Sequence, residues 1–525
     1  MDNSEIPLEL AASNKITLDY IKCAEHIKEV FPKHFTKPKI RNFKGSREEI
    51  VDKLLQYNRR ICAPRRVIQN IESLSQPDTY AIITGQQPGL FTGPLYTVYK
   101  AISAIILCER LSDRKKALVP IFWNASEDDD LSEIDHITIF KQNTPFTILY
   151  KPQPIDVAFS HLQLDKESSK KMLSTIDLAS PDSEFKMKLM KRIHRLIDLS
   201  TTVADFFSRT MVHVFGKFGL IMIEPEPLRD SMTPIFQKLI RKPVECTRIL
   251  TKTSAQLNNL GYPAKIHKKP NSCNFFIISD KGKRLQVTYK RDAHKFQCGD
   301  ESFSKEEILK LLSDNPLAFG ANAVIRPITQ DFLFPTFGYV AGPNEIAYCA
   351  QLQGIYEFFS LEMPIIFPRF GATIAEKKIS KVIKKYKAEI TEFKDPEKLL
   401  KKLAGKKFEV FNSLKQEVSR GMIRATKEAE AVDKSLVASI QTARIKILRA
   451  IETLESKFAS KIKENDLVTR QQIMKAYNNL FPNGNLQERQ INVLEYLIKF
   501  GDGFLRTVHE SFSKAKYGEH KVIEC

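Results

Sequence analysis

The segment TYAIITGQQPGLFTGPLYTVYK, residues 79–100, joins a short apolar run to a loop rich in Gly and Pro. Residues 80–83 are continuously apolar and predict a buried strand, whereas residues 84–93 predict a loop. Pro94 suits the first turn of a helix, where its missing N–H costs nothing, and residues 95–111 keep apolar side chains on a helical period. The segment therefore predicts strand, loop and helix in succession.

A second apolar run, residues 117–123, follows this helix after a short polar break. Two strands joined by a helix form a βαβ unit, in which the strands are parallel. The second strand runs directly into the acidic sequence NASEDDD, residues 124–130. In open α/β sheets, ligands bind beyond the carboxyl ends of the strands. We therefore expect the Gly-rich loop and the acidic sequence to face one site.

The rest of the chain alternates between core segments and insertions. Its fold class is predicted to be α/β, a parallel-sheet core with inserted connective segments and a C-terminal helical coiled-coil arm. Further core strands are expected at 218–223, 323–326 and 364–368, with a helix at 344–359. The predicted segments are an N-terminal helical segment (1–75), the first half of the core (76–150), a helical insertion (151–215), a core strand and helix (216–235), a second insertion with antiparallel strands at 274–279 and 284–289 (236–315), the second half of the core (316–375), the coiled-coil arm (376–480) and a C-terminal segment that packs back on the core (481–525).

The predicted arm has a regular apolar seam. Its members follow spacings of 4, 3, 4, 3 and 4, which keep one stripe against a partner helix; they are Leu436, Ile440, Ala443, Ile447, Ala450 and Leu454. Pro396 and Gly405 interrupt the helical pattern earlier in the arm. An antiparallel arm with breaks is therefore expected rather than one unbroken rod.

Charge and cysteine content narrow the functional classes. The 525-residue chain carries a formal charge of +19, and residues 377–525 hold 31 Lys and Arg against 19 Asp and Glu, which is +12 of that total. A solvated, dimerising arm accounts for this charge, and a basic coiled-coil protein that binds nucleic acid is the alternative from another class. The eight cysteines form no CxxC pair, and no apolar run is long enough to span a bilayer. These features predict a cytoplasmic protein without a membrane partner.

Two amides and two carboxylates are the first candidate site residues. The loop contains Gln86 and Gln87 but matches neither a Walker A sequence nor a GxGxxG fingerprint, so a tight turn packed beneath the sheet is the competing interpretation. Asp128 and Asp130 are candidates for a general base or for Mg²⁺ binding, because Mg²⁺ prefers oxygen ligands. A solvated helix start explains the same acidic residues equally well.

A second group of candidates lies in the sequence RPITQDFLFPTFGYVAGPNEIAY, residues 326–348. Arg326 is suited to a carboxylate or phosphate, and Glu345 to an ammonium group. The competing interpretations are a salt bridge from Arg326 to Asp331 and a helix cap by Glu345. The ten histidines show no ligand spacing, so metal catalysis of the zinc type is not expected, and no residue is predicted as a zinc-type metal ligand.

Four segments together resemble the bacillithiol-synthesis cysteine ligases, the BshC family. The matching segments are residues 84–100, 119–130, 326–348 and 368–376, and their order and spacing agree over essentially the whole chain. The resemblance implies a Rossmann-like core, homodimers formed through the arm, the binding of an adenine nucleotide, and a ligase that adds L-cysteine to glucosaminyl malate. We expect ATP to activate the cysteine carboxyl group, with Mg²⁺ as a candidate cofactor. We predict catalytic roles for Asp128, Asp130, Arg326 and Glu345, and cofactor binding by Thr84, Gly85, Gln86, Gln87, Gly93 and Tyr96.

This chain departs from the wider pattern at two places. Nucleotidyltransferases that the family resembles carry an HxGH motif on the first βα turn, where this chain has Phe91-Thr92-Gly93-Pro94. The family's acidic motif EDHD carries a histidine at the position where this chain has Asp129, so a group that titrates near neutrality is missing here. If that histidine is the general base of the family, Asp128 or Asp130 would replace it in this chain. Activation through an adenylate or an acyl phosphate stays open, as does a related ligase that acts on another amine.

Overall fold

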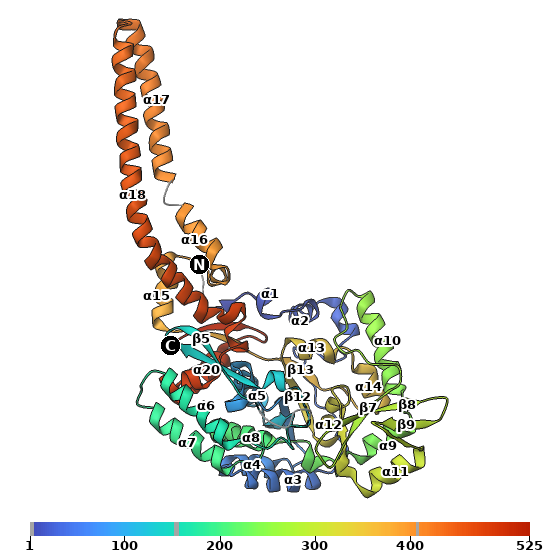
Figure 1. Cartoon of the computed structure of the whole chain (residues 1–525). Coiled ribbons are helices and arrows are strands. Elements are labelled where there is room, and N and C mark those ends of the chain that lie inside the picture. Colours follow the sequence, from blue (N-terminus) through green and yellow to red (C-terminus); the bar gives the residue numbers. More distant parts are fainter. Residues whose placement is uncertain (1–4, 42, 152–156, 406–408) are drawn as a thin grey trace. The chain divides into compact units, whose positions relative to one another are not determined.

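The computed structural model describes residues 5–41, 43–151, 157–405 and 409–525. The chain divides into two compact units. The core unit runs as far as Thr373 and resumes at Leu486–Ile523, and the arm unit comprises Ile374–Asn485 with Glu524–Cys525 (Figure 1). The C-terminal segment thus belongs to the same unit as the sheet.

Within these described residues, five parallel strands form the central sheet in the order β13-β12-β2-β3-β6 (Figure 1). Their bounds are β2 (Thr79–Gln86), β3 (Ala117–Asn124), β6 (Ile221–Ile223), β12 (Thr336–Ala341) and β13 (Ile365–Pro368). The first strand lies in the middle, and the sheet grows through β3 and β6 on one side and through β12 and β13 on the other. This is the Rossmann strand order, with a switch point between β2 and β12. The predicted α/β fold class is confirmed.

Helix α5 (Leu95–Leu111) begins and ends at the predicted residues and contacts both β2 and β3. All but one of its residues from Leu95 to Cys108 are buried. A helix that is apolar on every side belongs in the protein interior. The α5 sequence therefore favours a position between the sheet and a further layer.

One predicted core strand is wrong. Residues 323–325 form a turn and residue 326 begins a helix, because the side-chain carbonyl of Asn322 accepts hydrogen bonds from the N–H groups of Val324 (3.0 Å) and Ile325 (3.3 Å). Helix α12 (Arg326–Leu333) begins at the end of this turn, with a proline in its first turn. The core strand is β12, whose six residues are all buried. Its sequence TFGYVA lies between prolines and glycines, and no strand was predicted there.

The helix predicted over residues 344–359 is two helices. They are α13 (Pro343–Cys349) and α14 (Gln353–Phe358). The predicted strand at 218–223 is shorter than expected, because residues Gly216–Phe218 form a 3₁₀ turn before β6.

The first insertion is mainly helical. It contains α6 (Lys166–Ala179), α7 (Lys186–Leu199) and α8 (Val203–Phe215), and a hairpin of β4 (His136–Lys141) and β5 (Thr144–Leu149) precedes it. These elements share one apolar cluster with Leu90 and Phe91 of the Gly-rich loop and with Leu494 and Ile498 of the C-terminal segment. The loop is therefore anchored by its apolar side chains.

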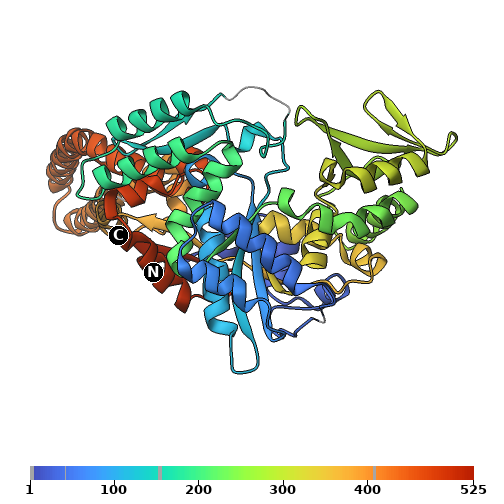
Figure 2. The ribbon, with the colours of Figure 1, turned by 90° about the horizontal axis from the view of Figure 1, so that it is seen from below.

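The second insertion is a small antiparallel sheet with helices. The sheet has the order β10-β9-β8-β7-β11, and the predicted antiparallel pair is confirmed as β7 and β8. Figures 1 and 2 show this module at one end of the central sheet and helices α6 and α7 at the other. Its elements are α9 (Thr233–Arg241), α10 (Glu245–Asn259), β7 (Ser272–Ile278), β8 (Arg284–Lys290), β9 (Lys295–Cys298), β10 (Glu301–Phe303), α11 (Lys305–Asp314) and β11 (Phe319–Ala321).

The N-terminal helices and the segment Leu486–Ile523 complete the core unit. The N-terminal part is helical, as expected, apart from the short strand β1, which pairs antiparallel with β15. These elements are β1 (Glu5–Ile6), α1 (Leu8–Ala11), α2 (Lys15–Ile21), α3 (Arg47–Arg60), α4 (Arg65–Ser73), β14 (Gly371–Ala375), α19 (Leu494–Phe500), α20 (Gly503–Lys514) and β15 (His520–Glu524).

The arm unit consists of α15 (Lys377–Tyr386), α16 (Pro396–Gly405), α17 (Glu409–Val432) and α18 (Leu436–Leu480). The helices α17 and α18 contact each other along the arm, which confirms the predicted interrupted, antiparallel pair. The predicted seam is not the surface that α17 covers, because Leu436 and Leu454 are 43% and 57% exposed whereas Ile451 is 5% exposed. The α18 sequence carries two neighbouring apolar stripes, and its spacing does not reveal which one faces α17.

Candidate active site

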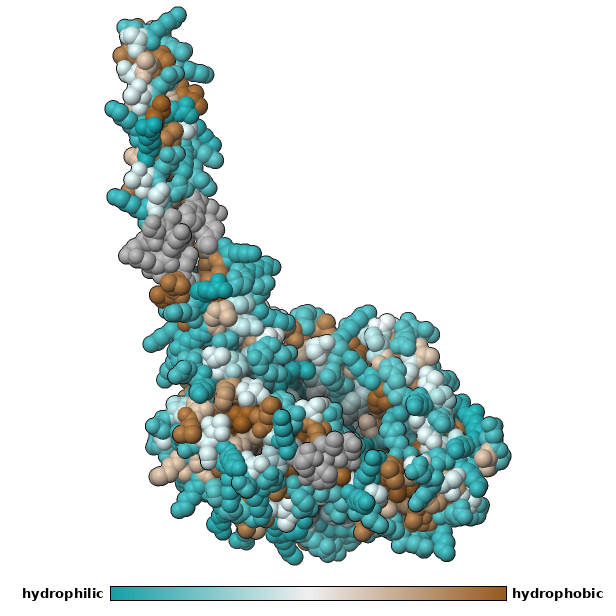
Figure 3. Space-filling model, viewed as in Figure 1, coloured by the Kyte–Doolittle hydropathy of each residue, from teal (hydrophilic) through white to brown (hydrophobic). Residues whose placement is uncertain are grey.

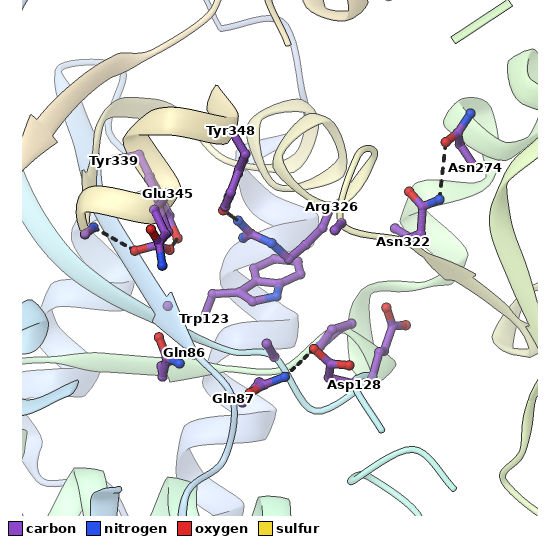
Figure 4. A pocket seen from close by; sticks show the side chains of 18 of the residues that line it. Gln86, Gln87, Trp123, Asp128, Asn274, Asn322, Arg326, Tyr339, Glu345 and Tyr348 are labelled. Atoms are coloured by element: carbon purple, nitrogen blue, oxygen red, sulfur yellow. Dashed lines mark hydrogen bonds between the residues drawn. The ribbon is translucent and has the colours of Figure 1, made fainter. Parts of the chain in front are cut away.

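A pocket of about 530 Å³ lies at the carboxyl ends of β2, β3 and β12, beside the switch point of the sheet (Figure 4). Seven predicted site residues line it, namely Gly85, Gln86, Gln87, Tyr96, Asp128, Arg326 and Glu345. Three others that the structure describes, Thr84, Gly93 and Asp130, are not among the lining residues. The second insertion closes one side of the pocket with Asn274 and Arg284. Ligand pockets of enzymes commonly have this size and position.

Glu345 is the centre of a buried polar cluster. It lies in the first turn of α13 and accepts from the Gly342 N–H at 2.7 Å, so the predicted cap is present. Its carboxylate also accepts from the Tyr339 hydroxyl at 2.7 Å and pairs with Lys100 Nζ at 2.5 Å. The Lys100 ammonium in turn donates to the Gly85 carbonyl and to Gln86 Oε1, each at 2.9 Å. The carboxylate of Glu345 is therefore already paired with an ammonium group of the protein itself, that of Lys100.

The cluster shifts the acidity of its members. Burial opposes ionisation of Glu345, but the Lys100 ammonium and the hydrogen bonds from Gly342 and Tyr339 hold the pKa of Glu345 below its ordinary value. Burial lowers the pKa of Lys100, although Glu345 opposes that change. Burial and the Glu345 charge raise the pKa of Tyr339 well above its ordinary value. The tyrosine therefore stays protonated and donates its hydrogen bond to an ionised carboxylate.

Arg326 has neutral hydrogen-bond partners. It donates to the Tyr348 hydroxyl at 3.1 Å and to Gln330 Oε1 at 3.3 Å, and its guanidinium lies 5.5 Å from the centre of the Tyr339 ring. The alternative salt bridge with Asp331 is not formed, because that carboxylate accepts from the Gln330 amide and the Tyr356 hydroxyl. Burial disfavours the charge, but the neighbouring Tyr339, Tyr348 and Glu345 raise the pKa of Arg326. Arg326 thus presents a permanent positive charge to the pocket.

The acidic sequence is largely neutralised by arginines. Asp128 accepts from the Gln87 amide at 2.5 Å and from Arg284 at 3.1 Å, and the same guanidinium lies 2.5 Å from Asp129. Glu127 is buried in an ion pair with Arg229 at 2.9 Å. Asp130 is exposed and caps a 3₁₀ turn by accepting from the Ser132 N–H. Of these carboxylates, Asp128 is the one with both a place in the pocket and partial exposure.

The Gly-rich loop is held from behind by the C-terminal segment. The Asn492 side chain donates to the carbonyls of Leu90 (3.2 Å) and Gly93 (3.0 Å), and the Leu95 N–H donates to the Ile491 carbonyl at 2.9 Å. The N–H of Gly93 is bonded to the Leu90 carbonyl. The N-terminus of α5 therefore has its first N–H groups bonded within the protein, and it does not offer the anion site that a free helix N-terminus provides.

Thr84 and Gly85 have packing roles in β2. The Thr84 hydroxyl donates to the Val340 carbonyl at 3.0 Å, which ties β2 to β12 across the switch point. A Cβ at Gly85 would lie 2.6 Å from the carbonyl oxygen of Trp123, its partner on β3. Gly85 therefore permits the close approach of the two strands. Tyr96 lies at the pocket and accepts a hydrogen bond of 3.3 Å from the Gln86 amide.

Sequence reasoning missed several residues that line the pocket: Lys100, Trp123, Lys268, Arg284, Tyr339, Arg369 and Arg489. Arg369 forms a buried bidentate ion pair with Glu488, whose neighbour His520 is bonded to the Thr373 hydroxyl at 2.9 Å. Trp123, Tyr339 and Arg369 fall inside the segments that carry the family resemblance, so position in those segments was the available signal. Arg284 lies in an insertion and carried no such signal.

Across residues 5–41, 43–151, 157–405 and 409–525, no group of three or more His, Cys, Asp or Glu side chains is placed to hold a metal ion. None of the helices in those ranges is long and apolar enough to cross a membrane.

The sheet order and the charged pocket at its switch point define a Rossmann-like α/β enzyme with an arm of antiparallel helices. The family models for the N-terminal Rossmann-like domain and the C-terminal coiled-coil domain of bacillithiol biosynthesis BshC match residues 1–370 and 372–525. The chain therefore belongs to the BshC family of bacillithiol biosynthesis.

Similar proteins support the same assignment over nearly the full length. A protein of Salinibacter ruber is 33% identical over 490 residues, which cover 91% of this chain and 89% of the relative. Proteins of Chlorobaculum tepidum and of Bacillus cereus strain B4264 are each 30% identical, over 92% and 91% of this chain and 89% and 90% of the relatives. All three bear the name "Putative cysteine ligase BshC".

Proposed function

We propose that this chain is a cysteine ligase that joins the carboxyl group of L-cysteine to the amine of glucosaminyl malate by an amide bond, with ATP as co-substrate. The observation that carries the proposal is the composition of the pocket. Arg326, whose hydrogen-bond partners are neutral, and the partly exposed carboxylate of Asp128 line one cavity. A substrate that bears both carboxylates and an amine is complementary to this arrangement.

The pocket also favours an acidic substrate. Arg489 and Lys268 add positive charge to that of Arg326, whereas Glu345 is paired with Lys100 and Arg369 with Glu488. The malyl group of glucosaminyl malate carries two carboxylates. Cations in a partly dry cavity attract such a group more strongly than cations in water do.

Asp128 is the residue that we propose as the base. An amine attacks an acyl carbon only after it has lost its extra proton, and the amide product requires the loss of a further proton. Asp128 lines the pocket, and the Gln87 amide and Arg284 fix its orientation. Asp130 is exposed and engaged as a cap, so we assign it no proton transfer.

ATP would supply the activation that turns the cysteine carboxylate into an acyl donor. We place no phosphate at Gly93, because the adjacent N–H groups are bonded within the protein. The polar side chains that line the pocket near this loop are Gln86, Gln87 and Tyr96. Mg²⁺ would enter with the nucleotide phosphates, since phosphate oxygens and water commonly supply most of its ligands.

The test is an assay of the purified chain with L-cysteine, glucosaminyl malate, ATP and Mg²⁺, followed by mass spectrometry. We expect a new thiol with the mass of the amide, formed only with ATP, and AMP or ADP as the second product distinguishes the two activation routes. No such thiol under several metal and reductant conditions would overturn the proposal. Equal or better turnover with another amine would favour a related ligase with a different acceptor.

We also propose that the protein is a cytoplasmic homodimer that associates through its arm and does not bind nucleic acid. Its eight cysteines are all free thiols, which suits a reducing compartment. Figure 3 shows apolar side chains among the hydrophilic ones of the arm, and Leu436, Ile447 and Leu454 are each more than a third exposed. An apolar stripe with heptad spacing on an exposed helix is typical of a helix that pairs with a second chain.

A further inference from the structure

The indole of Trp123 carries a buried donor without an acceptor. Trp123 is the one tryptophan of the chain, and its side chain is 1% exposed. It lines the pocket, and among the described residues its Nε1–H has no hydrogen-bond partner. The indole N–H can only donate, and a buried donor without an acceptor costs free energy. The protein therefore holds this group ready for an acceptor that a ligand brings.

The indole is held firmly in place. Its strand pairs with β2 at Gly85, and the Phe334 ring packs edge-on at 6.4 Å between ring centres. A side chain at Gly85 would collide with the Trp123 backbone, so this glycine sets the depth at which the indole lies. In Figure 4 the indole lies across the floor of the pocket, between Gln86 and Arg326. The donor is thus preorganised rather than free to turn toward another partner.

Two carboxylates that line the pocket are already in use. Glu345 accepts from Gly342, Tyr339 and Lys100. Asp128 accepts from Gln87 and Arg284. Within the part of the chain that the structure describes, the Oε1 atom of Gln87 is buried without a donor, but it does not bond the indole, whose N–H is also without a partner. An acceptor for the indole N–H must therefore come from a ligand, and the positive charge of Arg326 favours an anionic one.

We propose that the Trp123 N–H and the Arg326 guanidinium together bind one carboxylate of the malyl group, which makes Trp123 a specificity-determining residue. The identity of the acid rests on the proposed function. The malyl carboxylates stay ionised throughout the reaction, whereas the cysteine carboxyl must act as a nucleophile and then lose its charge. A fixed pair of hydrogen-bond donors suits a carboxylate that does not react. The same donors would lower the nucleophilicity of a carboxylate that has to react.

The single tryptophan makes this site directly observable. In the wild-type protein we expect L-malate and glucosaminyl malate to change the emission of Trp123 in a saturable way, whereas glucosamine alone leaves it unchanged. A change caused by cysteine rather than by malate would overturn the malyl assignment. Unchanged emission at saturating glucosaminyl malate in an active protein would overturn the whole proposal.

A Trp123→Phe variant removes the N–H and keeps an aromatic ring. We expect the KM for glucosaminyl malate to rise about tenfold, as for the loss of one hydrogen bond to a charged group. We expect kcat and the KM for cysteine to stay within about twofold, because the chemistry and the second substrate are untouched. The matched control is Thr97→Val, which removes a different buried polar group without a hydrogen-bond partner among the described residues, a hydroxyl on α5 outside the pocket lining. Equal KM values in the Phe variant and the wild type would contradict the proposal.

A double-mutant cycle tests whether the two donors share one carboxylate. If they do, Trp123→Phe should cost much less in an Arg326→Gln background than in the wild type. Additive losses would contradict a shared carboxylate. Calorimetric titration of both single variants with L-malate measures the donor pair even if the chain makes no amide, so failure of the proposed function and failure of this inference are distinguishable.

Discussion

At the scale of single residues, Asp129 is the departure from the family pattern with the clearest structural consequence. It stands where the resemblance places a histidine, and it adds a negative charge beside Asp128. The Arg284 guanidinium contacts both carboxylates and lies 4.3 Å from the centre of the Phe276 ring. One cation from the second insertion thus balances two neighbouring negative charges. With a neutral histidine at position 129, the charge of Asp128 alone would need a partner.

We expect Arg284→Gln to lower kcat/KM about tenfold, because Asp128 loses the cation that orients it and faces the charge of Asp129 without compensation. The matched control is Lys283→Gln, which removes the same charge from an exposed neighbour. Steady-state kinetics with thermal unfolding of both variants provides the measurement. Equal losses in the two variants would mean that the effect is general electrostatics rather than the orientation of Asp128.

His520 predicts a dependence of stability on pH. Burial and the charge of Arg369 lower the pKa of His520, although Glu488 opposes them. The unfolded chain therefore binds this proton more readily, so stability falls as pH drops below the ordinary histidine value of about 6.5. The slope from one such group is at most ~1.4 kcal/mol per pH unit.

We expect His520→Gln to remove this part of the pH dependence between pH 7.5 and 5.5 in urea unfolding experiments. His267→Gln changes an exposed histidine and should leave the dependence as it is in the wild type. The same slope in the wild type and in His520→Gln would contradict the assignment.

At the scale of elements, the turn between β2 and α5 is shaped by the C-terminal segment. Phe91, Thr92 and Gly93 all have positive φ angles. The Asn492 side chain donates to the carbonyls of Leu90 and Gly93 at the two ends of this turn. Such backbone is strained unless its surroundings hold it. The C-terminal segment therefore stabilises a loop that lies 400 positions earlier in the chain.

We expect Asn492→Ala to lower the free energy of unfolding by about 2–4 kcal/mol, because two buried carbonyls and the Leu494 N–H lose their partner. Asn485→Ala, at an exposed asparagine, is the control and should cost less than about 0.5 kcal/mol. Denaturant unfolding of both variants measures the difference. A loss below 1 kcal/mol for Asn492→Ala would show that the loop keeps its shape without this residue.

At the scale of the whole molecule, the arm differs in character from the core unit. Its long helix α18 exposes apolar residues, and the part of the sequence that contains it holds most of the positive charge. Exposed apolar side chains in a helical stripe favour association with a second chain. Positive charge spread along the same helices favours solvation of the remaining faces.

We expect the protein to sediment as a dimer with twice its chain mass of 60.1 kDa. The double variant Leu436→Glu, Leu454→Glu should be monomeric, because association would bury the two introduced charges, and their desolvation costs free energy. Glutamate at the exposed Gln441 and Thr453 adds the same charge to the same helix and is the control. A wild-type protein that is monomeric at tens of micromolar would contradict the dimer.

The sequence by itself determined the family, the α/β fold class and the elements whose patterns are local. Helix α5 and the antiparallel pair of β7 and β8 are examples, because apolar periodicity and turn residues specify them within a few positions. The strand β12 was missed because its glycine and its flanking prolines and glycines outweigh its apolar residues in any local window.

Only the tertiary structure decided which side chains share the pocket. Strand order in a parallel sheet places Gly85, Trp123 and Tyr339 together although 254 positions separate the first from the last. The packing of the C-terminal segment and of the second insertion also brings Asn492 to Gly93 and Arg284 to Asp128. A sequence pattern reports which face of an element is apolar, but the convergence of polar side chains depends on register and packing between distant segments, which no local pattern contains.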